Sequence, residues 1–273
     1  MMTVRGWRRL VSSPTDCNNR VKLELRAWNL RIVQELCWMV NDKRPNLVLL
    51  METKAQKKKM ENIRIKLTFP NMFIVESVGK SEGLVLFWED GCDVEIQNYS
   101  NRHINATIHN HQLQVDWKFT SFYGHPDVTR RIEARNLLKA LTPLSLVPWM
   151  CIGDVNEILT VSEKVGGLTR QQNQMRAFQQ TLEFCGLTDL GFVGPKFTWS
   201  NCQEGDAFIK ERLDRRVANF AWKNFFPEAE IAVEATICSD HLPLYLHLTK
   251  PHKHNHRKPR FFYEASWGME TGC

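Results

Sequence analysis

Short runs of apolar residues, each of strand length, recur along most of this chain, and only a few stretches between them have helical spacing. The clearest run, at residues 47–51, is apolar throughout and is typical of a strand that is buried on both faces. Many short strands with a few intervening helices favour two sheets packed face to face, with helices on the outside. The pattern therefore predicts an α/β sandwich.

Period-2 alternation, β-branched content and turn residues place the individual strands. We expect strands at residues 21–27, 47–51, 72–78, 83–88, 93–97, 104–108, 113–123, 149–152, 196–200, 208–213, 231–237 and 244–248. Apolar residues at i, i+3, i+4 and i+7 spacing predict helices at residues 33–40, 132–141, 175–185 and 217–226. Polar residues at strand ends would gather at one rim of such a sandwich.

Length and composition are consistent with a single globular domain. The chain has 273 residues and is 43% hydrophobic, which is enough to bury a large core. We expect a leader at residues 1–20, the folded domain at 21–250 and a basic tail at 251–273. No apolar run approaches the roughly 20 residues of a membrane-spanning helix, and no secretory signal is present, so we expect neither membrane association nor secretion.

Charge and cysteine content narrow the function only slightly. The formal charge of +6 favours contact with a polyanion without proving it. The eight cysteines are scattered and form no C-x-x-C pair, so we expect no structural zinc and no disulfide framework. Nothing in the sequence indicates a small-molecule cofactor.

Seven polar side chains come directly after predicted strands. They are Asn29, Glu52, Asp154, Asn156, Asp214, Asp240 and His241. Each alone is typical of a turn or a strand end, because short polar side chains bond to their own backbone. Together they make up the inventory that hydrolysis of a phosphodiester requires at neutral pH.

The chemistry assigns each of them a role. A hard cation such as Mg²⁺ needs oxygen ligands, and Glu52 is the best candidate, assisted by Asn29 or Asp240. A carboxylate must orient and deprotonate the attacking water, and Asp154 with Asn156 two residues on suits this role. A histidine held by an acidic partner stabilises charge on the phosphoryl group, which predicts a pair between His241 and Asp214.

Seven short motifs carry a family resemblance. In chain order they are LRAWN, LLMETK, FYGHP, IGDVNEIL, FTWSN, ERLDR and SDHLPL. Their order and spacing over residues 23–248 resemble the DNase I-like endonuclease/exonuclease/phosphatase superfamily, and most closely its plant LINE-type retrotransposon endonuclease domains. The resemblance implies a four-layer α/β sandwich and a monomeric Mg²⁺- or Mn²⁺-dependent enzyme that nicks DNA in the nucleus, or in the cytoplasm.

The resemblance also implies residue roles. Asn29 and Glu52 would hold the metal, and Asp240 would complete the acidic cluster beside it. Tyr123 would reach the scissile phosphate, and Asn156 would bind the phosphate. Contact with nucleic acid is implied for three further residues, Trp199, Asn201 and Arg212. For Trp199, packing in the core or at the rim is the alternative to stacking on a base.

Two other functions stay open at this point. One is a catalytically inactive remnant of a retroelement, since the loop after Asn29 is several residues shorter than in the family and the shortening would impair activity. The other is a sugar- or inositol-phosphate phosphatase of the same superfamily. The segment at residues 258–267 resembles the start of a linker toward a reverse transcriptase, and the basic run at residues 54–59 is either a solvated face or a phosphate contact.

Overall fold

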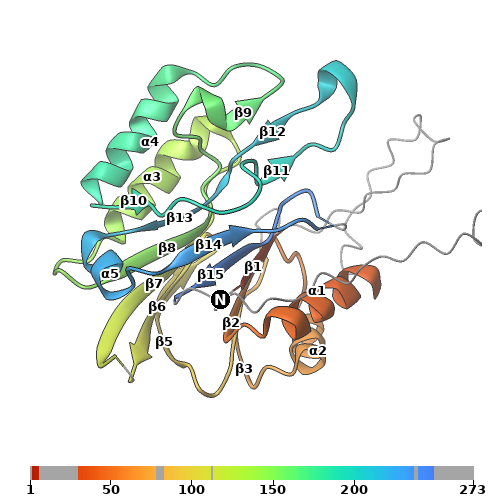
Figure 1. The fold of residues 1–273 in the computed structure, drawn as a ribbon, viewed down its shortest axis with the longest axis vertical. Coiled ribbons are helices and arrows are strands. Elements are labelled where there is room, and N and C mark those ends of the chain that lie inside the picture. The colour runs from red at the N-terminus through yellow and green to blue at the C-terminus, as the bar shows by residue number, and fades with distance from the viewer. Residues whose placement is uncertain (1, 6–29, 78–82, 112, 237–238, 249–273) are drawn as a thin grey trace, which may run out of the picture.

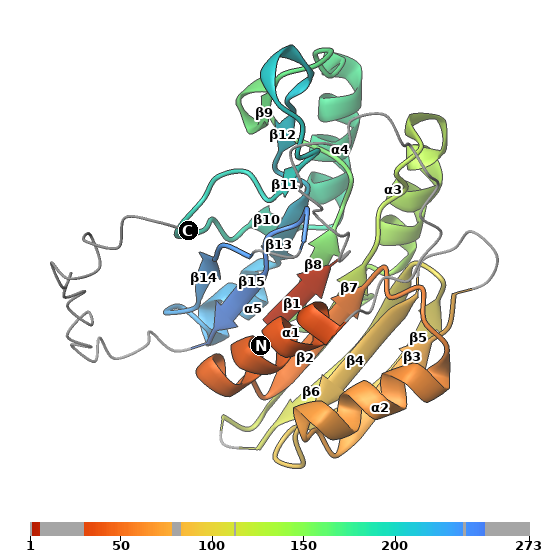
Figure 2. The same cartoon turned by 90° about the vertical axis from the view of Figure 1, so that its right-hand side faces the viewer.

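Two six-stranded sheets face each other, and helices cover both outer faces (Figures 1 and 2). This computed structural model describes residues 2–5, 30–77, 83–111, 113–236 and 239–248. The layers follow in the order helices, sheet, sheet, helices. The predicted four-layer α/β sandwich is therefore confirmed.

The first sheet contains, in spatial order, β14 (Glu230–Val233), β15 (Leu244–His247), β1 (Met2–Arg5), β2 (Leu47–Met51), β4 (Leu84–Trp88) and β3 (Asn71–Val75). The second contains β10 (Thr188–Asp189), β13 (Asp214–Ala218), β8 (Trp149–Asp154), β7 (Val115–Phe122), β6 (His103–Asn110) and β5 (Asp93–Ser100). A small third sheet contains β11 (Trp199–Ser200), β12 (Lys210–Glu211) and β9 (Lys164–Val165).

Five α-helices complete the described part of the chain: α1 (Leu30–Lys43), α2 (Lys57–Leu67), α3 (Arg131–Ala140), α4 (Gln172–Phe184) and α5 (Phe220–Phe225). Short 3-10 turns, η1 (Val128–Arg130), η2 (Val161–Glu163) and η3 (Gly205–Ala207), lie in the loops. Helices α1 and α2 cover the first sheet, and α3 and α4 cover the second (Figure 1). None of the described helices is long and apolar enough to cross a bilayer.

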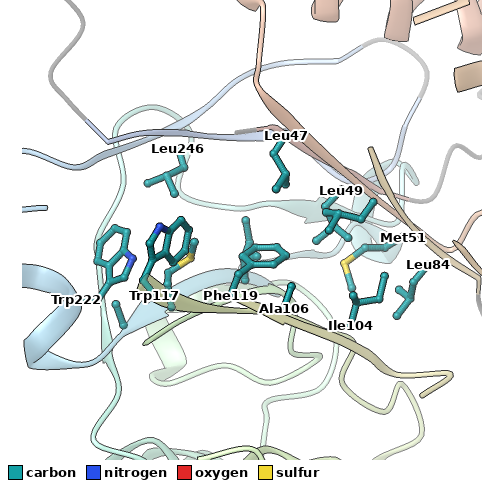
Figure 3. Packing of buried hydrophobic residues seen from close by; sticks show 14 of the residues in the cluster. Leu47, Leu49, Met51, Leu84, Ile104, Ala106, Trp117, Phe119, Trp222 and Leu246 are labelled. Carbon is teal, nitrogen blue, oxygen red and sulfur yellow. The ribbon is translucent and has the colours of Figure 1, made fainter. Parts of the chain in front are cut away.

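Strand β2 shows how an unbroken apolar run makes this architecture. Successive side chains of a strand point to opposite faces. Leu47, Leu49 and Met51 pack between the two sheets, where Figure 3 shows them on the side facing Phe119 of β7 and Ala106 and Ile104 of β6. The alternate residues of β2 pack against the helices α1 and α2 instead. An apolar residue is therefore required at every position, as the sequence predicted.

The helix 57–67 was missed in the sequence. Its surface is rich in lysine, and we interpreted the beginning of this stretch only as a basic run. The helix nevertheless buries Met60, Ile63 and Leu67, which follow at i, i+3 and i+7 and pack on the first sheet. Three apolar residues are enough for a helix that covers a sheet with one narrow face.

The helix predicted at residues 217–226 was too long. Val217 and Ala218 belong to β13, where they pair with Cys151 and Met150 of β8. The helix begins only after Asn219, whose side chain accepts a hydrogen bond from the backbone N–H of Trp222 and caps it. The strands predicted at 196–200 and 208–213 likewise shrink to the two-residue strands β11 and β12.

Strand β1 lies within the stretch 1–20 that we expected to precede the domain. It runs parallel to β2, with Arg5 opposite Met51, and antiparallel to β15. The first sheet therefore includes these four residues of the expected leader. The strand predicted at residues 21–27 lies outside the described residues, as does the tail after residue 248.

One buried histidine makes a pH dependence of stability predictable. His103, 5% exposed, bonds through Nδ1 to Ser100 (2.7 Å) and through Nε2 to Asn98 (2.9 Å). Burial, aided by Lys118, lowers its pKa to about 4. Between about pH 6.5 and pH 4, His103 binds a proton in the unfolded chain but stays neutral in the folded protein. The free energy of unfolding therefore falls as the pH falls from about 6.5 to 4.

We expect this single group to cost up to about 3 kcal/mol of unfolding free energy between pH 7 and pH 4. Urea unfolding at several pH values would measure it, with His103→Gln as the comparison. The variant should lose less stability on acidification than the wild-type protein. Parallel pH profiles of the two proteins would contradict the prediction.

Candidate active site

Glu52 and Tyr123 meet at one edge of the sandwich, where β2 and β7 end. The hydroxyl of Tyr123 donates to Oε1 of Glu52 at 3.1 Å, although the two residues are 71 positions apart in the chain. They come together because β2 and β7 lie in facing sheets. Glu52 has a φ of 54°, in the left-handed region, which a non-glycine residue rarely adopts and which often marks a functional site.

Asp154 and Asn156 follow next along this edge. Asp154, the last residue of β8, is fully buried. Its Oδ1 accepts the backbone N–H of Asn156 at 2.8 Å, and its Oδ2 accepts the Asn156 side-chain amide at 2.5 Å. Two donors thus hold the carboxylate in one orientation. The predicted pairing of Asp154 with Asn156 is present in the structure.

Gly124 connects this pair to Tyr123. Its N–H donates to the Asp154 carbonyl at 2.6 Å, and its own carbonyl accepts the Asn156 amide at 3.2 Å. A Cβ on Gly124 would lie 2.0 Å from the Val155 carbonyl oxygen, so no larger residue fits without moving the backbone. The two ends of β7 and β8 are therefore in direct contact.

Asp214 and His241 form the next pair. Asp214 is the cross-strand partner of Asp154, because β13 and β8 are antiparallel neighbours. Oδ2 of Asp214 lies 2.7 Å from Nδ1 of His241, and both side chains are at most 5% exposed. A carboxylate beside Nδ1 orients the imidazole. The predicted pair is thus formed.

Asp240 is held by a tryptophan. The indole N–H of Trp199 donates to Oδ2 of Asp240 at 3.2 Å, and the Ser200 N–H donates to the Asp240 carbonyl at 3.0 Å. The other carboxylate oxygen, Oδ1, is buried and accepts no hydrogen bond from the residues that the structure describes. A buried carboxylate oxygen without a donor needs a compensating partner, and a cation would provide one.

These residues fit a Mg²⁺ ion that takes only one or two ligands from the protein. In the part of the chain that the structure describes, no three His, Cys, Asp or Glu side chains are grouped as metal ligands. Mg²⁺, however, retains several waters and needs only one or two protein carboxylates together with substrate phosphate. Glu52 and the Oδ1 atom of Asp240 are suitable oxygens, whereas Asn29 lies outside the described residues.

His125, just beyond Gly124, contributes no positive charge to this edge at neutral pH. It is 6% exposed, and its Nδ1 accepts the Asp127 backbone N–H at 3.1 Å. Burial lowers its pKa, and the nearby cations Arg102 and Arg130 lower it further. Its ring is therefore neutral near pH 7.

The three predicted nucleic-acid contacts differ in how the structure uses them. Trp199 is half-buried and lies with its ring centroid 6.3 Å from that of His241, so it supports the site and still reaches its surface. Asn201 closes the loop 201–209, donating to the Ala207 carbonyl and accepting the Ile209 N–H. Its side-chain bonds are thus within its own loop.

Arg212 pairs with two carboxylates. Its guanidinium bonds to Glu163 at 3.3 Å and to Asp189 at 2.9 Å, and only 11% of the side chain is exposed. A phosphate that approached this guanidinium would compete with both carboxylates for it. The prediction that Arg212 binds nucleic acid stays a prediction, and the structure adds that this side chain already has two carboxylate partners.

The sequence reasoning missed three residues of this edge, although all lie within the quoted motifs or beside them. Gly124 joins the ends of β7 and β8, as described above. The Thr198 hydroxyl accepts the N–H groups of both Leu213 and Asp214. The Ser239 hydroxyl accepts the His241 N–H at 3.0 Å. Small hydroxyl residues next to a candidate catalytic group were the available signal.

Solved structures resemble this fold at low sequence identity. The endonuclease domain of TRAS1, a telomere-specific non-LTR retrotransposon, has a TM-score of 0.57 and 15% identity, covering 81% of this chain and 93% of its own. The AP endonuclease LMAP from Leishmania major has a TM-score of 0.59 and 13% identity, with coverage of 78% and 81%. The 3'-5' exonuclease NExo from Neisseria meningitidis has a TM-score of 0.59 and 15% identity, with coverage of 80% and 94%.

No family model matches the sequence, and no curated protein matches it. At 13 to 15% identity the likeness to these structures establishes the fold alone. The layer arrangement of this chain, the solved structures that share it and the order of the sequence motifs all indicate the same fold. The chain therefore has the DNase I-like fold, which it shares with the endonuclease domain of a retrotransposon.

Proposed function

We propose that this chain is a metal-dependent phosphodiesterase that hydrolyses the DNA backbone, of the retrotransposon endonuclease type. One observation carries the proposal, namely an uninterrupted series of contacts along a single edge. Glu52 bonds Tyr123, Gly124 bonds Asp154, and Asp154 lies opposite Asp214, which bonds His241. The side chains that phosphodiester hydrolysis needs are therefore neighbours, although Glu52 and His241 are far apart in the sequence.

The metal would be held by Glu52, with Asp240 and Asn29 as further oxygen donors. When bound, it supplies Lewis-acid polarisation of a phosphoryl oxygen. Asp154, held in place by Asn156, orients the attacking water and accepts its proton. His241, aligned by Asp214 through Nδ1, acts as the imidazolium and donates its Nε2–H to an oxygen of the phosphoryl group as negative charge develops there. Tyr123 hydrogen-bonds the scissile phosphate.

DNA is the substrate that the available observations favour. The proteins with this fold include an endonuclease domain from a retrotransposon, an AP endonuclease and an exonuclease. The formal charge of +6 agrees with a polyanionic substrate. On this basis we propose a nuclear, monomeric enzyme and a closest relationship to plant LINE-type domains, with the folded domain at residues 21–250 joined by the strand Met2–Arg5.

Nicking of supercoiled plasmid tests the function. The wild-type protein should convert supercoiled to relaxed plasmid with Mg²⁺ or Mn²⁺ and should stop when EDTA removes the metal. His241→Ala should be strongly impaired under the same conditions. Equal inactivity of the wild-type protein and the variant would instead favour an inactive remnant. Release of inorganic phosphate from inositol phosphates, without nicking, would favour the phosphatase function.

A further inference from the structure

Four charged side chains form a closed ring behind Asp154 and Asp214. Glu163 contacts Arg212 at 3.3 Å and also pairs with Arg215. Asp189 contacts the same two arginines, Arg212 at 2.9 Å and Arg215 at 2.7 Å. Each carboxylate thus has two cations and each cation has two carboxylates. We call these four residues the charge ring.

The charge ring is shielded from solvent. The exposed fractions of the side chains are 0% for Arg215, 8% for Glu163, 11% for Arg212 and 18% for Asp189. Burial by itself raises the pKa of Asp189, but the two arginines outweigh it and hold that pKa below its ordinary value. If one member of this set is removed, a buried charge is left without its partner. The position of each of the four side chains therefore depends on the other three.

Its position relates the charge ring to the candidate active site. Arg215 directly follows Asp214 on β13, and neighbouring strand residues point to opposite faces of a sheet. Across the strand pair, Arg215 lies opposite Gly153, the residue just before Asp154. Asp214 faces the first sheet and His241, whereas Arg215 faces the other way. The charge ring therefore lies on the opposite face of the second sheet, directly behind the strand ends that carry Asp154 and Asp214.

Glu163 extends this anchoring to the loop that carries Asn156. Its Oε2 accepts the Leu159 N–H at 2.7 Å, and its backbone carbonyl accepts the Arg212 N–H at 2.9 Å. The Val155 N–H also donates to the Leu213 carbonyl at 3.0 Å. The loop that leaves β8 is thus tied to β13 at both of its ends, once by backbone and once by the charge ring.

We propose that Glu163 and Arg215 are positioning residues that keep Asp154 and Asn156 at a constant separation from Asp214 and His241. The proposal rests on the proposed hydrolysis at this edge. Neither residue touches substrate. A displacement of about 1 Å in a catalytic group can lower a rate about a hundredfold, so loosening this loop should act on turnover more than on binding.

Glu163→Gln tests the inference by two independent readouts. In DNA nicking, kcat should fall about 10- to 100-fold while KM stays within about twofold. In hydrogen exchange, the Val155 and Asn156 amides should lose protection while those of β2 keep theirs. Glu163→Asp keeps the charge but is one methylene too short, so it should fold and fall between wild type and Glu163→Gln in both readouts.

The matched control is Glu234→Gln, which removes the carboxylate from an ion pair with Lys43 beside the first sheet. It should leave kcat and the exchange of Val155 and Asn156 unchanged. Unchanged exchange in both Glu163 variants would overturn the positioning role whether or not the protein cleaves DNA. An inactive wild-type protein would overturn the proposed function alone, because the exchange experiment does not depend on activity. A rise in KM at constant kcat would also overturn the positioning role.

Discussion

Asp154→Asn is expected to fold and to bind DNA, but to cleave it about 10² to 10⁴ times more slowly than the wild-type protein. Asparagine has nearly the same shape as aspartate but cannot accept the proton of the attacking water. Both carboxylate oxygens of Asp154 accept hydrogen bonds from Asn156. In the variant, the side-chain NH₂ group of the new asparagine must therefore face one of these two N–H donors. We expect this to cost about 1–3 kcal/mol of unfolding free energy.

Single-turnover nicking at saturating protein measures the chemical step for Asp154→Asn, and fluorescence anisotropy of labelled duplex in EDTA measures binding without cleavage. Urea unfolding gives the stability change. Asp93→Asn is a suitable control, since Asp93 is an exposed carboxylate bonded only to the exposed His111 in the described part of the chain. Wild-type cleavage by Asp154→Asn would show that another group activates the water.

Glu52→Ala is expected to lose about a thousandfold in metal-dependent cleavage, since a divalent ion contributes several kcal/mol of transition-state charge stabilisation. Stability should change little, because Glu52 lies at a strand end and is only half-buried. The hydrogen bond that Glu52 accepts from Tyr123 contributes about 1 kcal/mol. The loss should therefore appear in the metal requirement and not in the fold.

A Mg²⁺ titration of the nicking rate measures this effect for Glu52→Ala, together with calorimetric titration of Mg²⁺ into each protein. The matched control is Glu76→Ala, because Glu76 follows β3 of the same sheet and accepts only the Lys57 N–H among the described residues. Glu76→Ala should retain the wild-type metal dependence. Unchanged turnover in Glu52→Ala would remove Glu52 from the metal site.

The site residues that sequence reasoning found share one property. Glu52, Asp154 and His241 are polar residues at or near the ends of apolar strands, and in a sandwich such strand ends converge on one edge. The contact between Asp154 and Asn156 could also be predicted from the sequence, since these two residues are only two positions apart. The tyrosine was found only through the family resemblance, because no periodicity marks a single aromatic residue beyond the end of a strand.

The fold was predictable wherever side-chain periodicity records burial. The apolar run 47–51 determined that β2 is covered on both faces, and the alternation of short runs determined that two sheets pack together. The helix α2 was not predicted because only three of its residues form its buried apolar face. Local sequence thus determined which residues are inside and which polar groups end the strands.

Tertiary structure alone decided the partners of the charges. Arg212 and Arg215 stand in a motif as two basic residues, and nothing local distinguishes a cation that faces a phosphate from one that faces a carboxylate. Their partners Glu163 and Asp189 lie 23 to 52 residues away and arrive only when β13, β10 and the loop after β8 come together. Ion pairs are set by distances in space, and the sequence records such distances only for neighbours along a strand or a helix.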